Sequence, residues 1–175
     1  MKRVVGTVFL LIAAVVLAGE LPQPVTGLKV SLPQVVEVGK VLPVDGISSA
    51  GLPDEAALKV FRDSGYVAVI DLRGANEKAD TDEQRIVNEL GMDYVPLPIS
   101  GGTDITFDNA QLLDNILKKY HGPVLVHCAS GNRVGALLAL RLSLQGADDD
   151  LALATGRAAG LTSLDETVQQ RLAEQ

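Results

Sequence analysis

The residues best suited to chemistry lie in one short segment, His127-Cys128-Ala129-Ser130-Gly131-Asn132-Arg133-Val134-Gly135. An apolar run that predicts a buried strand precedes the segment, and one that predicts a buried helix follows it. A turn of small residues between a strand and a helix aims several backbone N–H groups at one point, and the positive helix end strengthens their field. We therefore predict an anion-binding loop, whose substrate-binding residues are Ala129, Ser130, Gly131, Asn132 and Val134.

Two side chains add reactive groups to this loop. Cys128 is the chain's single cysteine, so no intramolecular disulfide accounts for it. Its place at the base of the loop, near a helix N-terminus, predicts a thiolate nucleophile. Arg133 offers a planar fork of donors that suits a tetrahedral oxyanion. The alternative, a buried thiol beside a surface arginine, leaves the joint placement of histidine, cysteine, glycine and arginine unexplained.

Strands and helices alternate around the segment. Short apolar runs predict buried strands at 66–72, 92–97 and 124–127, and apolar residues at helical spacing predict helices over 53–64, 80–90, 106–120, 134–144, 150–157 and 163–173. This alternation predicts an α/β fold: a single three-layer domain with a central, mainly parallel sheet flanked by helices. Ligands of such sheets bind at the carboxyl ends of the strands, where the cysteine segment lies.

Residues at the predicted helix starts have capping chemistry. Pro53 is expected at the first helical position, and Thr106 as an N-cap. Ser163 and Glu166 have the spacing of a capping box. The 148–150 aspartate run predicts a helix N-cap with solvated neighbours rather than a cation site.

Length and composition exclude several classes of protein. With 175 residues and 47% hydrophobic residues, the chain suits one domain. It has 15 Lys and Arg against 22 Asp and Glu, a net charge of -7, and no basic run beyond Lys118-Lys119. Nucleic acid is therefore not an expected partner. An aromatic content of 3% argues against base-stacking or carbohydrate-binding surfaces.

The chain begins with a segment that has the form of an export signal. Lys2 and Arg3 precede an uncharged run from Val4 to Gly19. We predict that residues 1–19 are a signal peptide or N-terminal anchor of a periplasmic or cell-envelope protein, which would touch the membrane only through this segment. An N-terminal arm over 20–45, with alternating stretches at 35–38 and 40–44 that favour an edge strand, should then lead into a catalytic domain over 46–175.

The His-Cys pair, the glycine-bearing loop and the arginine resemble the signature of the protein tyrosine phosphatase superfamily, in its dual-specificity type. Within it, the chain most resembles the phosphatase-like domain of beta-lactamase hydrolase-like proteins, through Ile47–Gly51, Val69–Arg73, Pro98–Gly102 and the cysteine loop. The resemblance implies a cysteine-phosphatase fold that hydrolyses phosphate monoesters of tyrosine, serine or threonine. It also implies Cys128 as nucleophile, Arg133 as phosphate clamp and His127 as the residue that tunes the thiolate, without a metal or organic cofactor.

Two further residues are candidates for this site. By analogy with the aspartate-bearing loop of the family, Asp104 is the candidate general acid, and the alternative is a loop or capping aspartate near Thr106. Arg73 ends a predicted strand at the same sheet edge as Cys128. It would either add positive field at the mouth of the site or pair with Glu77 as a surface cation.

Two departures from the phosphatase pattern favour other chemistry. Four residues separate Cys128 from Arg133, where the phosphatase signature has five, and the shorter spacing is similar to the active loop of rhodaneses. The next residue is Val134, where phosphatases have a serine or threonine hydroxyl that helps the thiolate leave. A sulfurtransferase that takes sulfur from a donor as a Cys128 persulfide is therefore one alternative function. A catalytically weak anion-binding module is another.

Overall fold

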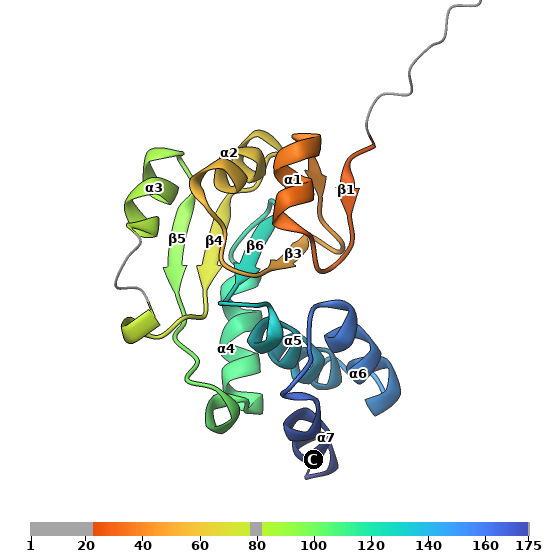
Figure 1. Ribbon diagram of the computed structural model, residues 1–175. Coiled ribbons are helices and arrows are strands. Elements are labelled where there is room, and N and C mark those ends of the chain that lie inside the picture. Colours follow the sequence, from red (N-terminus) through yellow and green to blue (C-terminus); the bar gives the residue numbers. More distant parts are fainter. Residues whose placement is uncertain (1–22, 78–81, 175) are drawn as a thin grey trace, which may run out of the picture.

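The computed structural model describes residues 23–77 and 82–174 (Figure 1). The predicted signal or anchor at residues 1–19 lies outside the described residues and stays a prediction. Within the described part of the chain, no helix is long and apolar enough to cross a membrane.

A parallel four-stranded sheet forms the centre of the fold (Figure 1). Its order is β3 (Ile47–Ala50), β6 (Val124–His127), β4 (Ala68–Asp71) and β5 (Asp93–Pro96), and every neighbouring pair is parallel. The three strands expected from the sequence are thus confirmed within their margins. In register, Ala50 and Asp71 flank His127 on its two sides. The carboxyl ends of three strands therefore meet immediately before the cysteine.

Helices cover both faces of this sheet (Figure 1). On one face lie α1 (Leu32–Val38), α2 (Glu55–Asp63) and α3 (Glu83–Glu89), which pack with Val69 and Leu125 of the strands. On the other lie α4 (Phe107–Leu117), α5 (Asn132–Leu144), α6 (Asp149–Ala158) and α7 (Asp165–Ala173), which pack with Ile70 and Val126. Successive strand residues thus contribute to two separate cores, as the pleat requires. This arrangement confirms the predicted three-layer α/β domain.

Strand β3 escaped the sequence analysis because two of its four residues are serines. Both hydroxyls are buried and hydrogen-bonded. Ser48 Oγ lies 2.6 Å from the Tyr66 hydroxyl, and Ser49 Oγ donates to the Ala159 carbonyl at 2.6 Å. Partners inside the fold therefore allow a strand without an apolar pattern to be buried.

The N-terminal arm folds against the domain instead of forming a single edge strand. Its strands β1 (Val25–Thr26) and β2 (Val41–Leu42) pair in parallel, and the second falls in the predicted 40–44 stretch. The strand predicted at 35–38 is wrong, because helix α1 occupies these residues. A proline in its first turn and Gly39 in the left-handed conformation (φ 70°) at its end delimit the helix.

Two of the predicted helix N-caps are confirmed. Thr106 caps α4 by accepting from the Asn109 N–H, and Asp148 caps α6 in the same way. Helix α2 starts two residues later than expected: Asp54 is its N-cap and Glu55 its first residue, so Pro53 precedes the helix. Two short 3-10 helices, η1 (Ala75–Glu77) and η2 (Gly102–Asp104), follow β4 and β5 at the carboxyl edge of the sheet.

Helix α5, which starts at the cysteine loop, packs unusually closely on α6. A Cβ atom added to Gly135 would lie 2.2 Å from the Leu161 backbone nitrogen and 2.5 Å from the Gly156 carbonyl oxygen. Only a glycine permits this approach of the two backbones. The close contact fixes where the N-terminus of α5, and thus the loop before it, lies.

Candidate active site: the cysteine loop

The loop between β6 and α5 forms a closed turn around the cysteine sulfur. Gly131 donates its backbone N–H to Cys128 Sγ at 3.1 Å, and its φ of 90° is the left-handed conformation that turns the chain into α5. Cys128 is buried, with 1% of its surface exposed. The sulfur thus sits at the base of a ring of backbone atoms beside a helix N-terminus, an arrangement that favours negative charge there.

Two neighbouring segments hold the loop in place. The backbone N–H of Leu52 donates to the Ala129 carbonyl at 3.2 Å, and a Cβ atom on Gly51 would lie 3.1 Å from that oxygen. The Ala129 and Ser130 side chains are exposed. The segment after β3 therefore supports the outer side of the loop, and these two residues face solvent.

Asn132 anchors the loop to the segment between α6 and α7. Its Oδ1 accepts from the Thr162 N–H at 2.7 Å, and its Nδ2 donates to Ser163 Oγ at 2.7 Å. These partners occupy the side-chain amide, so a contact of Asn132 with substrate, which stays a prediction, would come from its backbone N–H in the loop. The capping box predicted for Ser163 and Glu166 is wrong, because Leu164 rather than Ser163 is the N-cap of α7 and no side chain caps this helix.

Arg133 lies between the cysteine and an acidic partner that the sequence analysis assigned elsewhere. Its Nη1 and Nη2 donate to the two carboxylate oxygens of Glu77 at 2.7 and 2.5 Å, and Nη1 also donates to the Ile99 carbonyl at 2.8 Å. Glu77 first, and then the charge and hydrogen bonding of Cys128, raise the pKa of Arg133. The guanidinium is therefore held within reach of the sulfur.

Glu77 and Arg133 face each other in a cavity of about 440 Å³ at the carboxyl edge of the sheet. Its lining residues are Gly74, Ala75, Asn76, Glu77, Ser100, Gly101 and Arg133. The hydrogen bond from Arg133 is the main cause that lowers the pKa of Glu77 from 4.5 to about 2. The stabilisation from this ionised pair is complete above a pH of about 4.5 and is lost as the pH falls toward 2.

Val134 lies in the hydrophobic core rather than at the mouth of the site. Its side chain is fully buried in the same apolar cluster as Cys128. The prediction that Val134 contacts substrate is wrong, because the first turn of α5 directs this side chain inward. Val134 still differs from the serine or threonine of the phosphatase signature in having no hydroxyl group.

Asp104 braces the loop after β5. Its Oδ2 accepts from the Ser100 N–H at 2.7 Å, and its carbonyl accepts from Asn109 Nδ2 at 2.8 Å. These contacts are those of the loop aspartate that the sequence left as the alternative. Ser100 lines the cavity of Glu77 and Arg133. Asp104 is not a lining residue and reaches the cavity only through its hydrogen bond with Ser100. Its role as general acid stays a prediction.

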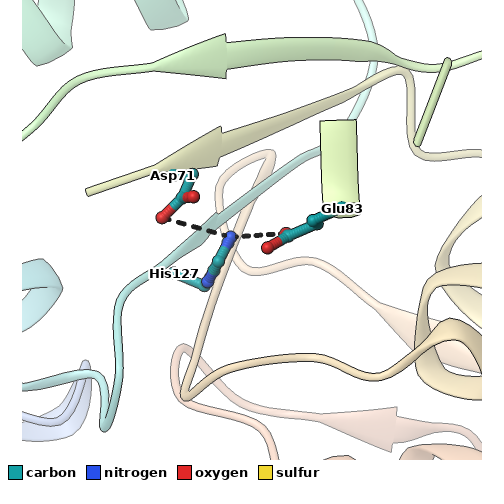
Figure 2. Close-up of side chains that lie close together, drawn as sticks. All are labelled: Asp71, Glu83 and His127. Atoms are coloured by element: carbon teal, nitrogen blue, oxygen red, sulfur yellow. Dashed lines mark ion pairs between the residues drawn. The ribbon is translucent and has the colours of Figure 1, made fainter. Parts of the chain in front are cut away.

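A cluster of buried charged side chains surrounds His127, the residue before the cysteine, and Figure 2 shows Asp71 and Glu83 beside its ring. His127 Nε2 is 2.7 Å from Glu83 Oε1 and 3.7 Å from Asp71 Oδ1. The closer contact has the distance of an ion pair but not the alignment of a hydrogen bond. Because adjacent strand residues point to opposite faces, His127 contacts this cluster while Cys128 points into the other core.

Arg73 belongs to this cluster and is 2% exposed. Its Nε donates to Asp71 Oδ1 at 3.1 Å, and its Nη2 donates to Asp71 Oδ2 at 3.0 Å and to Glu83 Oε2. The alternative that Arg73 is a surface cation is therefore wrong, but its buried charge still helps to lower the pKa of Glu77 in the cavity, as the other alternative expected. Two buried carboxylates draw the guanidinium inward, and the sequence gives no sign of the second one, on α3.

Neighbouring groups in the cluster stabilise the charged form of Asp71. Burial alone would raise the pKa of Asp71, but hydrogen bonds from Arg73, the charge of His127 and the Tyr94 hydroxyl hold it well below its ordinary value. Oxygen and nitrogen atoms of Asp71, Glu83 and His127 lie within 4.8 Å of one another, close enough to hold a metal ion. The guanidinium of Arg73 already pairs with both carboxylates, so the cluster fits an internal ion network better than a metal centre.

Comparison with known proteins agrees with this geometry. The family model of the beta-lactamase hydrolase-like protein, phosphatase-like domain, matches residues 47–147, from β3 to the end of α5. The chain belongs to this family. The beta-lactamase hydrolase-like protein of Agrobacterium fabrum is 30% identical over 104 residues, which are 57% of this chain and 24% of that protein. The chain thus spans about a quarter of the length of this relative.

Solved structures share the fold of this phosphatase-like domain. A DUF442 protein of Shewanella putrefaciens CN-32 has a TM-score of 0.59 and 24% identity, covering 75% of this chain and 84% of that one. The kinase associated phosphatase, solved with its catalytic site cysteine substituted by serine, has a TM-score of 0.56 and 13% identity, covering 74% and 88%. These matches confirm the expected cysteine-phosphatase fold, and the family supports a phosphatase-type function.

The buried cluster predicts a large effect of removing one charge. Glu83→Gln leaves Arg73 and His127 with one carboxylate instead of two, and we expect it to lower the free energy of unfolding by about 3 kcal/mol. Urea unfolding at neutral pH measures the change. Glu89→Gln on the exposed side of the same helix is the control and should have little effect. Equal stabilities of the two variants would contradict this description of the cluster.

The contact between Glu77 and Arg133 predicts that removing the charge of Glu77 strengthens the binding of an anion. Glu77→Gln keeps an oxygen acceptor for Arg133 but removes a negative charge from the cavity, so inorganic phosphate should bind about threefold more tightly. Isothermal titration calorimetry at low salt measures this affinity, with Glu37→Gln, at an exposed residue of α1, as the control. Weaker phosphate binding would show that the charge of Glu77 is needed to orient Arg133.

Proposed function

We propose that this protein is a cysteine-dependent phosphatase that hydrolyses phosphate monoesters, with phosphotyrosine, phosphoserine and phosphothreonine as the substrate class. The observation that carries the proposal is the position of Cys128 Sγ, which accepts the Gly131 N–H at the start of the helix that carries Arg133, in a phosphatase-like domain. Such a site combines a nucleophile with donors for the oxygens of a phosphoryl group.

The proposed reaction proceeds in two displacements at phosphorus. The Cys128 thiolate forms a sulfur–phosphorus bond as the bond to the ester oxygen breaks, while loop amides and Arg133 bind the phosphoryl oxygens. Asp104 is the proposed donor of a proton to the departing oxygen. Water then attacks the thiophosphate intermediate, releasing inorganic phosphate and the thiolate. His127 is proposed to favour the thiolate from its position at the end of β6, directly before the cysteine.

Sulfur transfer is the second candidate function, because of the short loop and Val134. With four residues between Cys128 and Arg133, the ring around the sulfur is one residue smaller than in the phosphatase signature. A smaller ring suits a terminal sulfur atom better than a phosphoryl group with three oxygens. Val134 also lacks a hydroxyl donor for the departing thiolate, which would slow hydrolysis of the thiophosphate.

We also propose that the protein acts outside the cytoplasm, in the periplasm or cell envelope. Lys2, Arg3 and the uncharged run over 4–19 support this location. The acidic net charge of -7 supports small or protein-borne phosphate esters, rather than nucleic acid, as substrates.

Two substitutions test the phosphatase proposal. Cys128→Ser should lower the hydrolysis of an aryl phosphate by about 10³-fold or more, because it removes the nucleophile. Val134→Thr has nearly the same shape, adds the missing hydroxyl, and should raise turnover about fivefold, as expected for one hydrogen bond to the leaving thiolate. Release of inorganic phosphate measures both rates.

A buried valine on the neighbouring strand offers a control, since Val69→Thr adds the same hydroxyl on the opposite face of the sheet. Activity that survives Cys128→Ser would contradict a cysteine mechanism. Turnover that Val134→Thr leaves unchanged or lowers would contradict the proposed slow step and would favour sulfur transfer or anion binding.

A further inference from the structure

Lys29, in the N-terminal arm, lies against the cysteine loop although it is outside the matched residues 47–147. The backbone of this residue is fixed on both sides. It forms a parallel bridge with Ser49 of β3, and its N–H donates to the Ala158 carbonyl at 3.2 Å. The arm therefore adds a residue to the carboxyl edge of the sheet, next to the strand that supports the loop.

Two glycines make room for the Lys29 side chain. Gly131 of the cysteine loop has a φ of 90°, and Gly160, after α6, has a φ of 107°. A Cβ atom on Gly160 would lie 2.8 Å from Lys29 Cδ, and one on Gly131 would lie 3.3 Å from Cε and 3.5 Å from Nζ. The aliphatic part of the lysine thus passes between two residues without side chains, and its ammonium group ends beside the loop.

Lys29 and Arg133 differ in their ion pairing within the described residues. Arg133 shares its guanidinium with Glu77, whereas Lys29 forms no ion pair with any residue in the described ranges 23–77 and 82–174. Lys29 is also exposed, so its ammonium is accessible to a ligand. The residue that it contacts, Gly131, is the one whose N–H donates to Cys128 Sγ.

We propose that Lys29 is a specificity-determining residue that binds a second anionic group of the substrate, beside the phosphate bound by the cysteine loop. The preferred substrates are then phosphate monoesters with a second negative charge, a phosphate or a carboxylate, close to the reacting group. The inference rests on the proposed function, and it assigns to the N-terminal arm a role in selecting substrates.

Binding of two anions tests the proposal without requiring turnover. In the full chain with Cys128→Ser, calorimetry compares inorganic phosphate with pyrophosphate, which carries the second anionic group. Lys29→Met keeps the packing between the two glycines and removes the charge. It should weaken pyrophosphate binding about fourfold, the range of an exposed ion pair, and phosphate binding by less than about twofold. Lys29→Arg should restore most of the loss.

Lys40→Met is the matched control, because it removes an exposed cation from the same arm. The proposal is overturned if Lys29→Met weakens both anions equally, if it changes neither, or if Lys40→Met has the same effect. Equal urea midpoints for the variants show that folding is unchanged.

Kinetics with the intact cysteine distinguish failure of the proposed phosphatase function from failure of the proposed role of Lys29. Lys29→Met should lower kcat/KM for 3-carboxyphenyl phosphate, mainly through KM, and leave phenyl phosphate nearly unchanged. Absence of hydrolysis of either ester by the unsubstituted chain would defeat the proposed phosphatase function, while the binding comparison would still decide the role of Lys29. Hydrolysis of both esters with no effect of Lys29→Met would overturn the inference alone.

Discussion

Cations placed at the edge of a buried sheet need counter-charges, and acidic residues that follow β4 provide them on both sides of the cysteine. In front, Glu77 holds Arg133 in the cavity, and behind, Glu83 holds Arg73 and approaches His127. A buried cation without such a partner would cost several kcal/mol. Glu77 lies in the short helix η1 after β4 and Glu83 is the first residue of α3, so two consecutive elements supply the acidic partners on both sides of the cysteine strand.

The backbone of the cysteine loop is fixed by contacts that do no chemistry themselves. Asn132 ties the loop to the segment before α7, Leu52 bonds its outer side, and Gly135 lets α5 approach α6 closely. These contacts place the Gly131 N–H on the sulfur before any ligand binds. A loop held by such contacts presents preorganised donors, which is how sites of this kind stabilise developing charge.

The sequence predicted the strand–loop–helix unit and the three-layer fold, because apolar runs and helical spacing are local signals. It did not predict β3, since buried serines satisfied by Tyr66 and by the Ala159 carbonyl break the apolar pattern. The partners of Arg73 and Arg133 were also missed. Pairing of charges depends on which residues the fold brings together. In the sequence, Glu83 resembles the exposed glutamates around it, and it becomes buried only because α3 packs on the sheet.

The central claim is that Cys128 attacks phosphorus, and the intact mass of the protein after rapid acid quench tests it most directly. Separate incubations with an aryl phosphate and with thiosulfate, beside a Cys128→Ser variant, distinguish the two chemistries. The account predicts the added mass of a phosphoryl group on the unsubstituted protein, absent from the variant. A single added sulfur without phosphorylation would contradict it and would make the protein a sulfur carrier on a phosphatase fold.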